Sequence, residues 1–257
     1  LPVKALNENA FPAMKNTKAL PKIATRAAAR IDAGAVFPRL GILALDTRFP
    51  RLPGDLGNPA SWPFAVAIHR VPNATVARVV RRDGPERTLL APFVAGIEAL
   101  QREGVAAVTT TCGFLVTFQE ELARASQVPF LASSLSLVPE IAASLPAGQR
   151  VGVVTIDAGA LSPAHLAAAK APADTPVEGI AAEGELARVI LGDRKRLDRA
   201  QAEAEAVAAA LRLIARAPSV GAIVLECANL PPYRSAIEES TGLPVHDLLT
   251  HFGVLLT

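Results

Sequence analysis

Residues 105–115 read V-A-A-V-T-T-T-C-G-F-L, an apolar run that passes through three threonines to Cys112. Residues 220–230 read V-G-A-I-V-L-E-C-A-N-L and repeat the arrangement around Cys227. In both stretches the cysteine comes seven residues after the opening valine and precedes a small residue, and the chain has no other cysteine. Two copies of one short pattern, each with its cysteine at the same place, indicate an internal repeat.

The flanks of the two stretches repeat as well. Pro129 follows Cys112 by 17 residues, and Pro244 follows Cys227 by the same 17. Upstream, residues 39–46 and 150–157 share Arg at the first position, Gly at the third and Asp at the eighth. The distances from that Gly to the cysteine are 71 and 75 residues. We therefore predict that the chain contains two copies of one structural unit.

Each copy reads as strands alternating with helices. The first has apolar strands at 41–45 and 64–69 and helical apolar spacing at 92–102, before the Cys112 strand, and again at 114–126. The second has a strand at 151–156 and a long amphipathic helix at 197–217 before the Cys227 strand. This alternation predicts parallel sheets with helices on both faces. The expected fold is α/β, with two pseudo-symmetric, open parallel-sheet (flavodoxin-like) halves that face each other across a cleft.

The repeat also predicts the domain boundaries. A length of 257 residues suits two units. The first half is expected at 39–149 and the second at 150–245, with a C-terminal segment, 246–257, that packs back on the first half. Residues 1–38 contain scattered prolines and no lasting apolar face, so a mobile leader is expected there. The Pro- and Gly-rich loop at 46–63 is long for a compact domain, which is typical of a functional loop.

Composition excludes several classes of protein. Residues 1–38 carry six Lys or Arg and two acids, net +4, which leaves net −2 for the remainder. The body therefore has no basic surplus with which to hold nucleic acid. No apolar run approaches the roughly 18 residues that cross a bilayer, so no membrane segment is expected. With two cysteines and no signal-peptide pattern, a cytoplasmic location is expected. The four histidines have no metal-ligand spacing.

The positions of the cysteines indicate chemistry. Both end a strand and precede a helix, so both are expected at the carboxyl edge of a parallel sheet, where ligands bind. The start of a helix favours a thiolate and binds carboxylates. Thiols on opposite walls of one cleft suit a racemase, in which one thiolate removes the proton next to a carboxylate and the opposite thiol returns one. Of the three threonines, Thr111 is expected to line this cleft.

Four sequence features together resemble the aspartate/glutamate/hydantoin racemase superfamily over roughly residues 39–257. They are T-T-C-G-F at 110–114, L-E-C-A-N-L-P-P at 225–232, the strand-ending Asp46-Thr47 and the loop P-G-D-L-G-N-P at 53–59. The resemblance implies cofactor-independent proton transfer at the carbon α to a carboxylate, with one cysteine from each half. It also implies that residues just after each cysteine, and loops after other strand ends, hold the substrate.

Carried over residue by residue, the resemblance makes Cys112 and Cys227 the acid/base pair. The implied substrate contacts, together with Thr111, are Asp46, Thr47, Gly113, Phe114, Ser133, Thr155, Ala228 and Asn229. Gly113 and Phe114 would donate backbone N–H groups, and Asp46 would be the partner of a cysteine. The chain departs from glutamate racemases, which follow the two cysteines with Asn-Thr and Thr-His. Glu226 is expected to point away from the cleft by strand alternation, and Arg78, Arg81, Arg82 and Arg87 are expected on a solvated surface.

The sequence therefore predicts an isomerase, an amino-acid racemase or epimerase without cofactor or metal, that acts on a small carboxylate. A maleate-type cis-trans isomerase or an arylmalonate-type decarboxylase of the same fold is the alternative, and a non-catalytic binding protein for small carboxylates is a third. No nucleic-acid or membrane partner is expected. The oligomeric state stays open, a homodimer being the commonest assembly.

Overall fold

The computed structural model describes residues 39–256, and the fold is reported for these alone. The leader expected at 1–38 lies outside the described residues.

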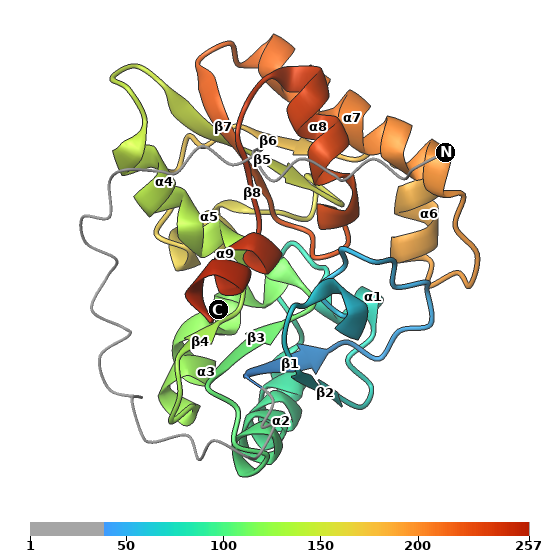
Figure 1. The fold of residues 1–257 in the computed structure, drawn as a ribbon, viewed down its shortest axis with the longest axis vertical. Helices are drawn as coiled ribbons and strands as arrows, with labels where there is room; N and C mark the ends of the chain where they lie inside the picture. Colours follow the sequence, from blue (N-terminus) through green and yellow to red (C-terminus); the bar gives the residue numbers. More distant parts are fainter. Residues whose placement is uncertain (1–38, 257) are drawn as a thin grey trace, which may run out of the picture. The chain divides into compact units, whose positions relative to one another are not determined.

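Two four-stranded sheets form the framework (Figure 1). The first contains β1 (Leu40–Ala44), β2 (Val66–Arg70), β3 (Ala107–Thr110) and β4 (Phe130–Leu131), and the second contains β5 (Arg150–Thr155), β6 (Val177–Gly179), β7 (Val220–Leu225) and β8 (Val245–His246). The strand orders are β2-β1-β3-β4 and β6-β5-β7-β8, and every pairing is parallel. The two sheets thus share one topology, which confirms the predicted α/β fold of two pseudo-symmetric halves.

The cysteine-bearing strands are central in both sheets. Strand β3 pairs with β1 and β4, and β7 pairs with β5 and β8. All residues of β3 and β7 are buried. A parallel strand covered on both faces needs a continuous apolar run, which explains why the segments before the cysteines show no polar alternation.

Helices cover the sheets, and their bounds follow the sequence patterns closely. The α-helices are α1 (Val76–Val79), α2 (Leu90–Arg102), α3 (Gln119–Ala125), α4 (Val138–Ser144), α5 (Pro163–Ala168), α6 (Glu185–Leu191), α7 (Arg199–Arg216), α8 (Arg234–Thr241) and α9 (Leu248–Leu255). Short 3-10 helices are η1 (Pro59–Ser61), η2 (Arg87–Leu89), η3 (Gly113–Phe118), η4 (Ser134–Leu137) and η5 (Pro231–Tyr233). The helix expected at 114–126 therefore begins as η3 and becomes α-helical only at Gln119. No helix within residues 39–256 combines the length and the apolar character needed to span a bilayer.

The repeated glycine has a packing role in each half. A Cβ on Gly41 would lie 3.0 Å from Leu100 of α2, and a Cβ on Gly152 would lie 2.7 Å from Leu213 of α7. In both halves the helix that leads into the cysteine strand therefore rests directly on the backbone of the strand beside it. The duplication preserves this close helix-to-sheet contact, which needs a residue without a side chain.

Contacts between the halves bring the two cysteine segments together. The Ser134 hydroxyl, in η4 of the first half, donates a 2.6 Å hydrogen bond to the Leu225 carbonyl at the end of β7. The Leu56 backbone N–H donates to the Ala228 carbonyl at 3.3 Å. Helix α9 adds Leu248 and Phe252 to an apolar cluster that includes Leu40 of β1. The carboxyl ends of β3 and β7 consequently meet at one place.

Candidate active site

Both cysteines line one small cavity between the ends of β3 and β7. Cys112 is 8% exposed and Cys227 is 7% exposed. The cavity has a volume of about 20 Å³, and its walls are formed by Leu45, Phe49, Val76, Val80, Thr111, Cys112, Gly113, Phe114, Ile156, Ile190, Glu226, Cys227 and Asn229. A volume of this size has room for about one water molecule. The site is therefore closed, and a substrate reaches the thiols only when a wall moves.

The two thiols have equivalent backbone surroundings. The Phe114 N–H hydrogen-bonds to the Cys112 sulfur, and the Asn229 N–H hydrogen-bonds to the Cys227 sulfur. Each donor lies two residues after its cysteine, where the chain turns from strand into helix. The sequence repeat thus supplies each sulfur with a backbone donor, which favours the thiolate form.

Burial outweighs these donors. It raises the pKa of Cys112 to about 12, helped by the nearby Glu226 carboxylate, while the Phe114 N–H and Arg51 act in the opposite direction. The pKa of Cys227 is raised well above its usual value by burial, with added repulsion from Glu226, Cys112 and Asp55. The expectation of thiols with lowered pKa is wrong for this closed site. Desolvation destabilises a thiolate by more than the helix start stabilises it.

Glu226 is a buried acid in the cavity wall. It is 2% exposed, and its Oε2 accepts a 2.6 Å hydrogen bond from the Thr155 hydroxyl. Its Oε1 has no hydrogen-bond partner within the described residues. Burial raises the pKa of this carboxyl to about 7, although Thr155 lowers it. The prediction that Glu226 points away from the cleft is wrong: β7 ends at Leu225, so strand alternation no longer applies beyond it.

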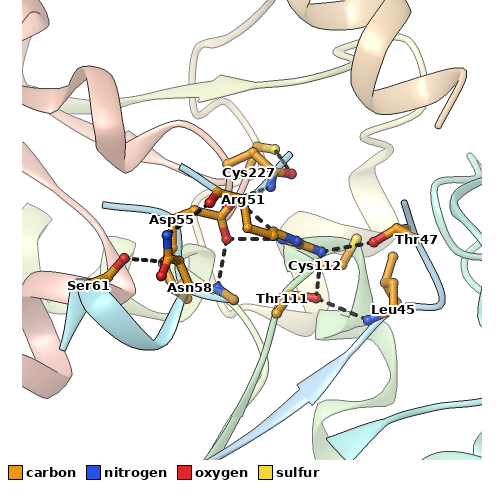
Figure 2. A network of polar contacts seen from close by, with 12 residues as sticks. Leu45, Thr47, Arg51, Asp55, Asn58, Ser61, Thr111, Cys112 and Cys227 are labelled. Carbon is orange, nitrogen blue, oxygen red and sulfur yellow. Dashed lines mark hydrogen bonds and ion pairs between the residues drawn. The ribbon is translucent and has the colours of Figure 1, made fainter. Parts of the chain in front are cut away.

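Arg51 places a cation beside Cys112 (Figure 2). Its Nη1 pairs with the Asp55 carboxylate at 3.1 Å, and its Nη2 donates to the hydroxyls of Thr47 at 3.2 Å and Thr111 at 3.5 Å. The guanidinium also stacks over the Phe49 ring, 4.5 Å from its centroid. The side chain is 18% exposed, so the charge sits at the mouth of the site in a fixed orientation.

Asp55 carries this network into the second half. Its carboxylate accepts hydrogen bonds from the Gly57 N–H at 2.7 Å and from the Asn229 amide at 2.5 Å. The Cys227 thiol in turn donates to Asn229 Oδ1 at 3.5 Å. The chain from Arg51 through Asp55 and Asn229 to Cys227 therefore holds Cys227 as a thiol, since its proton is used in a hydrogen bond.

The structure gathers most of the site residues expected from the sequence. Those that line the cavity are Thr111, Cys112, Gly113, Phe114, Cys227 and Asn229. Thr47 contacts it through Arg51, and Thr155 lies behind Glu226. Three residues lie outside the wall: Asp46 pairs with Arg70 at 3.3 Å, Ser133 caps η4 by accepting from the Leu135 N–H, and Ala228 accepts from Leu56.

The functional residues that sequence reasoning missed lie mainly in the loop at 46–63. Its length and its Pro-Gly-Asp motif singled it out, but nothing in the pattern distinguished Arg51 from its neighbours. Three of the arginines expected on a solvated surface pair with acids that do not line the cavity: Arg78 with Glu86, Arg81 with Asp83 and Arg87 with Glu121. Within residues 39–256 no three His, Cys, Asp or Glu side chains come together as metal ligands would.

A latch, defined here as Asp193 and its donors, holds this loop to the second half. Asp193 accepts from the Arg48 N–H at 2.5 Å, from Arg48 Nε at 2.9 Å and from the Phe49 N–H at 3.1 Å. Burial acts to raise the pKa of Asp193, but these donors hold it below its usual value. A larger pocket of about 210 Å³ lies under the same loop and shares Leu45 and Phe49 with the cavity.

We expect Asp193→Ala to speed amide hydrogen exchange in residues 48–57 by at least about tenfold, because it removes three hydrogen bonds worth about 0.5–1.5 kcal/mol each. Exchange in β1 should not change. Asp193→Asn is the matched control, since it keeps an acceptor oxygen and suits the left-handed backbone at this position (φ 48°). Hydrogen exchange by mass spectrometry measures both variants, and equal rates in the alanine variant and the wild type would show that Asp193 does not hold the loop.

Comparison with known proteins places this geometry in a family. The Asp/Glu/Hydantoin racemase family model matches residues 58–250. Two solved structures share the fold. Allantoin racemase from Klebsiella pneumoniae aligns with a TM-score of 0.57 and 16% identity, over 84% of this chain and 86% of that one. Unliganded arylmalonate decarboxylase aligns with a TM-score of 0.56 and 19% identity, over 85% of this chain and 92% of that one.

Curated relatives carry a different name. A dimethylsulfoniopropionate lyase of Durusdinium sp. clade D is 29% identical over 223 residues, 82% of this chain and 71% of that protein. Dimethylsulfoniopropionate lyases of Emiliania huxleyi match at 23–29% identity. This chain spans less than two thirds of the length of several of them, down to 44%.

Proposed function

The chain belongs to the aspartate/glutamate/hydantoin racemase family, and from that premise we propose that it is a lyase, which removes the proton α to a carboxylate and expels a substituent from the β carbon. The substrate we propose is dimethylsulfoniopropionate or a close analogue. The observation that carries the proposal is a mostly apolar cavity lined by two thiols, with the Arg51 cation acting on one of them, Cys112.

Cys112 is the better base of the two thiols. Arg51 lowers its pKa, whereas Cys227 has its proton in a hydrogen bond to Asn229 and is surrounded by groups that raise its pKa. A thiolate with a pKa near 12 is scarce at neutral pH, but it is a strong base once formed, and α protons of carboxylates are weakly acidic. Elimination moves one proton, so one thiolate is sufficient.

Arg51 is suited to hold the substrate carboxylate. Its fork of donors already faces the Thr47 and Thr111 hydroxyls beside Cys112. Loss of the α proton moves negative charge onto the carboxylate, and a fixed cation there stabilises the charge as it develops. Thr111 would share the contact, since its hydroxyl lies between Arg51 and the cavity.

The apolar walls suit the leaving group. Seven lining residues are hydrocarbon or aromatic, among them Phe49 and Phe114. Methyl groups on a sulfonium pack well against such walls, and aromatic rings attract an onium cation.

The elimination balances without a further reactant. The Cα–H bond breaks and the proton goes to the Cys112 sulfur. The electron pair of that bond forms the Cα–Cβ double bond, and the Cβ–S bond breaks with its pair on sulfur. From dimethylsulfoniopropionate the products are acrylate and dimethyl sulfide, and the proton later returns from Cys112 to solvent.

Racemisation is the second candidate, because both thiols line the same cavity. One experiment separates the two reactions. The protein is incubated in deuterium oxide with dimethylsulfoniopropionate, and separately with the enantiomers of aspartate, glutamate and allantoin. Headspace dimethyl sulfide with acrylate in solution supports the lyase. Inversion with deuterium at the α carbon supports the racemase, and would contradict the lyase if no dimethyl sulfide forms.

A further inference from the structure

Glu226 Oε1 is a buried carboxyl oxygen that has no hydrogen-bond partner among residues 39–256. The side chain is 2% exposed, and its other oxygen is occupied by Thr155 at 2.6 Å. In the proposed elimination Glu226 has no task, since Cys112 takes the proton and Arg51 holds the carboxylate. A buried, half-satisfied acid in the wall of a reaction site requires a separate explanation.

The surrounding chain is shaped to bring this oxygen to the wall. A Cβ on Gly113 would lie 2.2 Å from Glu226 Oε1, so the oxygen occupies space that any other residue at 113 would fill. Gly113 directly follows Cys112, and Glu226 directly precedes Cys227; all four residues line the cavity. The acid is thus built into the junction between the two cysteine segments.

We propose that Glu226 is the specificity residue for a cationic β substituent, so that the site selects zwitterions with a carboxylate at one end and a methylated onium group at the other. The proposal rests on the proposed function and names its substrate class. Arg51 and Glu226 then bind opposite charges, and the aromatic ring of Phe114 in the wall receives the methyl groups.

The electrostatics of the empty site support this assignment. Taking a carboxylate out of water is normally the main cost of a buried ion pair, but here folding has already desolvated Glu226. An onium ligand carries no N–H and needs no acceptor in the wall. It also cancels the repulsion by which Glu226 raises the pKa of Cys112. A bound onium substrate would therefore favour the thiolate form of Cys112, the base of the proposed reaction.

The test compares two ligands of nearly equal shape. One is trimethylammonio-propanoate, and the other is its tert-butyl isostere, in which carbon replaces the quaternary nitrogen. Binding is measured by isothermal titration calorimetry, so the result does not depend on turnover. We expect the full-length wild-type protein to bind the onium ligand roughly tenfold or more tightly than the isostere. Glu226→Gln should bring the ratio close to one by weakening the onium ligand alone.

Glu183→Gln is the control for net charge, since Glu183 is an exposed acid, and it should keep the wild-type ratio. A second measurement uses the wild type alone, so it tests the assignment even if Glu226→Gln fails to fold. The onium affinity should rise with pH through about 7, as Glu226 ionises, while the isostere affinity stays flat. Equal affinities in the wild type, an unchanged ratio in Glu226→Gln or a flat pH profile would each overturn the assignment. Onium selectivity without dimethyl sulfide release would leave it standing and contradict the lyase alone.

Discussion

Replacing Cys112 with serine is expected to lower the rate of elimination by a factor between about 10² and 10⁴, the usual contribution of a general base. Serine keeps the size of the side chain, but its hydroxyl ionises far less readily than a thiol. The Phe114 N–H and the Arg51 cation, which stabilise a thiolate at this position, cannot make up that difference. Initial rates of dimethyl sulfide release measure the effect.

Cys227→Ser is the matched control, and it separates elimination from racemisation. In the elimination Cys227 moves no proton, so this variant should retain about a tenth or more of the wild-type rate. In a racemase both thiols take part, and either serine variant would abolish inversion. Equal, severe losses of lyase activity in the two variants would show that Cys112 is not the sole base.

Changing Arg51 to lysine is expected to lower kcat/KM by about 10² to 10³, the cost of losing one positioned donor at a developing anion. Lysine keeps the charge, so the buried Asp55 still has a cation nearby, but it lacks the fork that reaches Asp55, Thr47 and Thr111 together. Arg70→Lys is the control, because Arg70 is 60% exposed and pairs with Asp46 outside the cavity wall. A similar loss in both variants would point to a general effect of replacing arginine, and not to the contacts of Arg51.

The pH profile of activity tests a second role of Arg51, its effect on the pKa of Cys112. The guanidinium lowers the pKa of Cys112, so Arg51→Gln should raise that pKa. Activity that depends on the thiolate would then begin at higher pH, and the acidic limb of kcat/KM would move upward. A limb that stays in place would mean that Arg51 binds substrate without acting on the thiol.

The elimination is consistent with a closed, dry site. A high thiol pKa is costly, at about 1.4 kcal/mol per pKa unit. In exchange, Arg51 and the backbone N–H groups act in a medium that screens them weakly. The contacts of Asp193 hold the loop that carries Arg51 to the second half, so in the proposed reaction carboxylate binding and exclusion of water would depend on the same segment.

The sequence by itself determined the fold and the matching positions of the two cysteines. Periodicity and spacing reveal local structure, and a duplicated strand-to-helix unit leaves few ways to arrange two parallel sheets. Because the cysteines occupy matching positions in the repeat, their placement at the ends of β3 and β7 followed from the pattern. The family resemblance singled out Gly113, Phe114 and Asn229, which line the cavity.

Tertiary structure alone decided the electrostatics. Arg51 lies in a loop without periodicity, and its role depends on Asp55, Thr111 and Asn229, which come from both halves of the chain. The pKa values of the thiols and of Glu226 depend on burial, which arises only when the halves meet. A sequence pattern shows which residues repeat, but not how far water is excluded from them. In this protein the exclusion of water sets the charge on each ionisable group around the cavity.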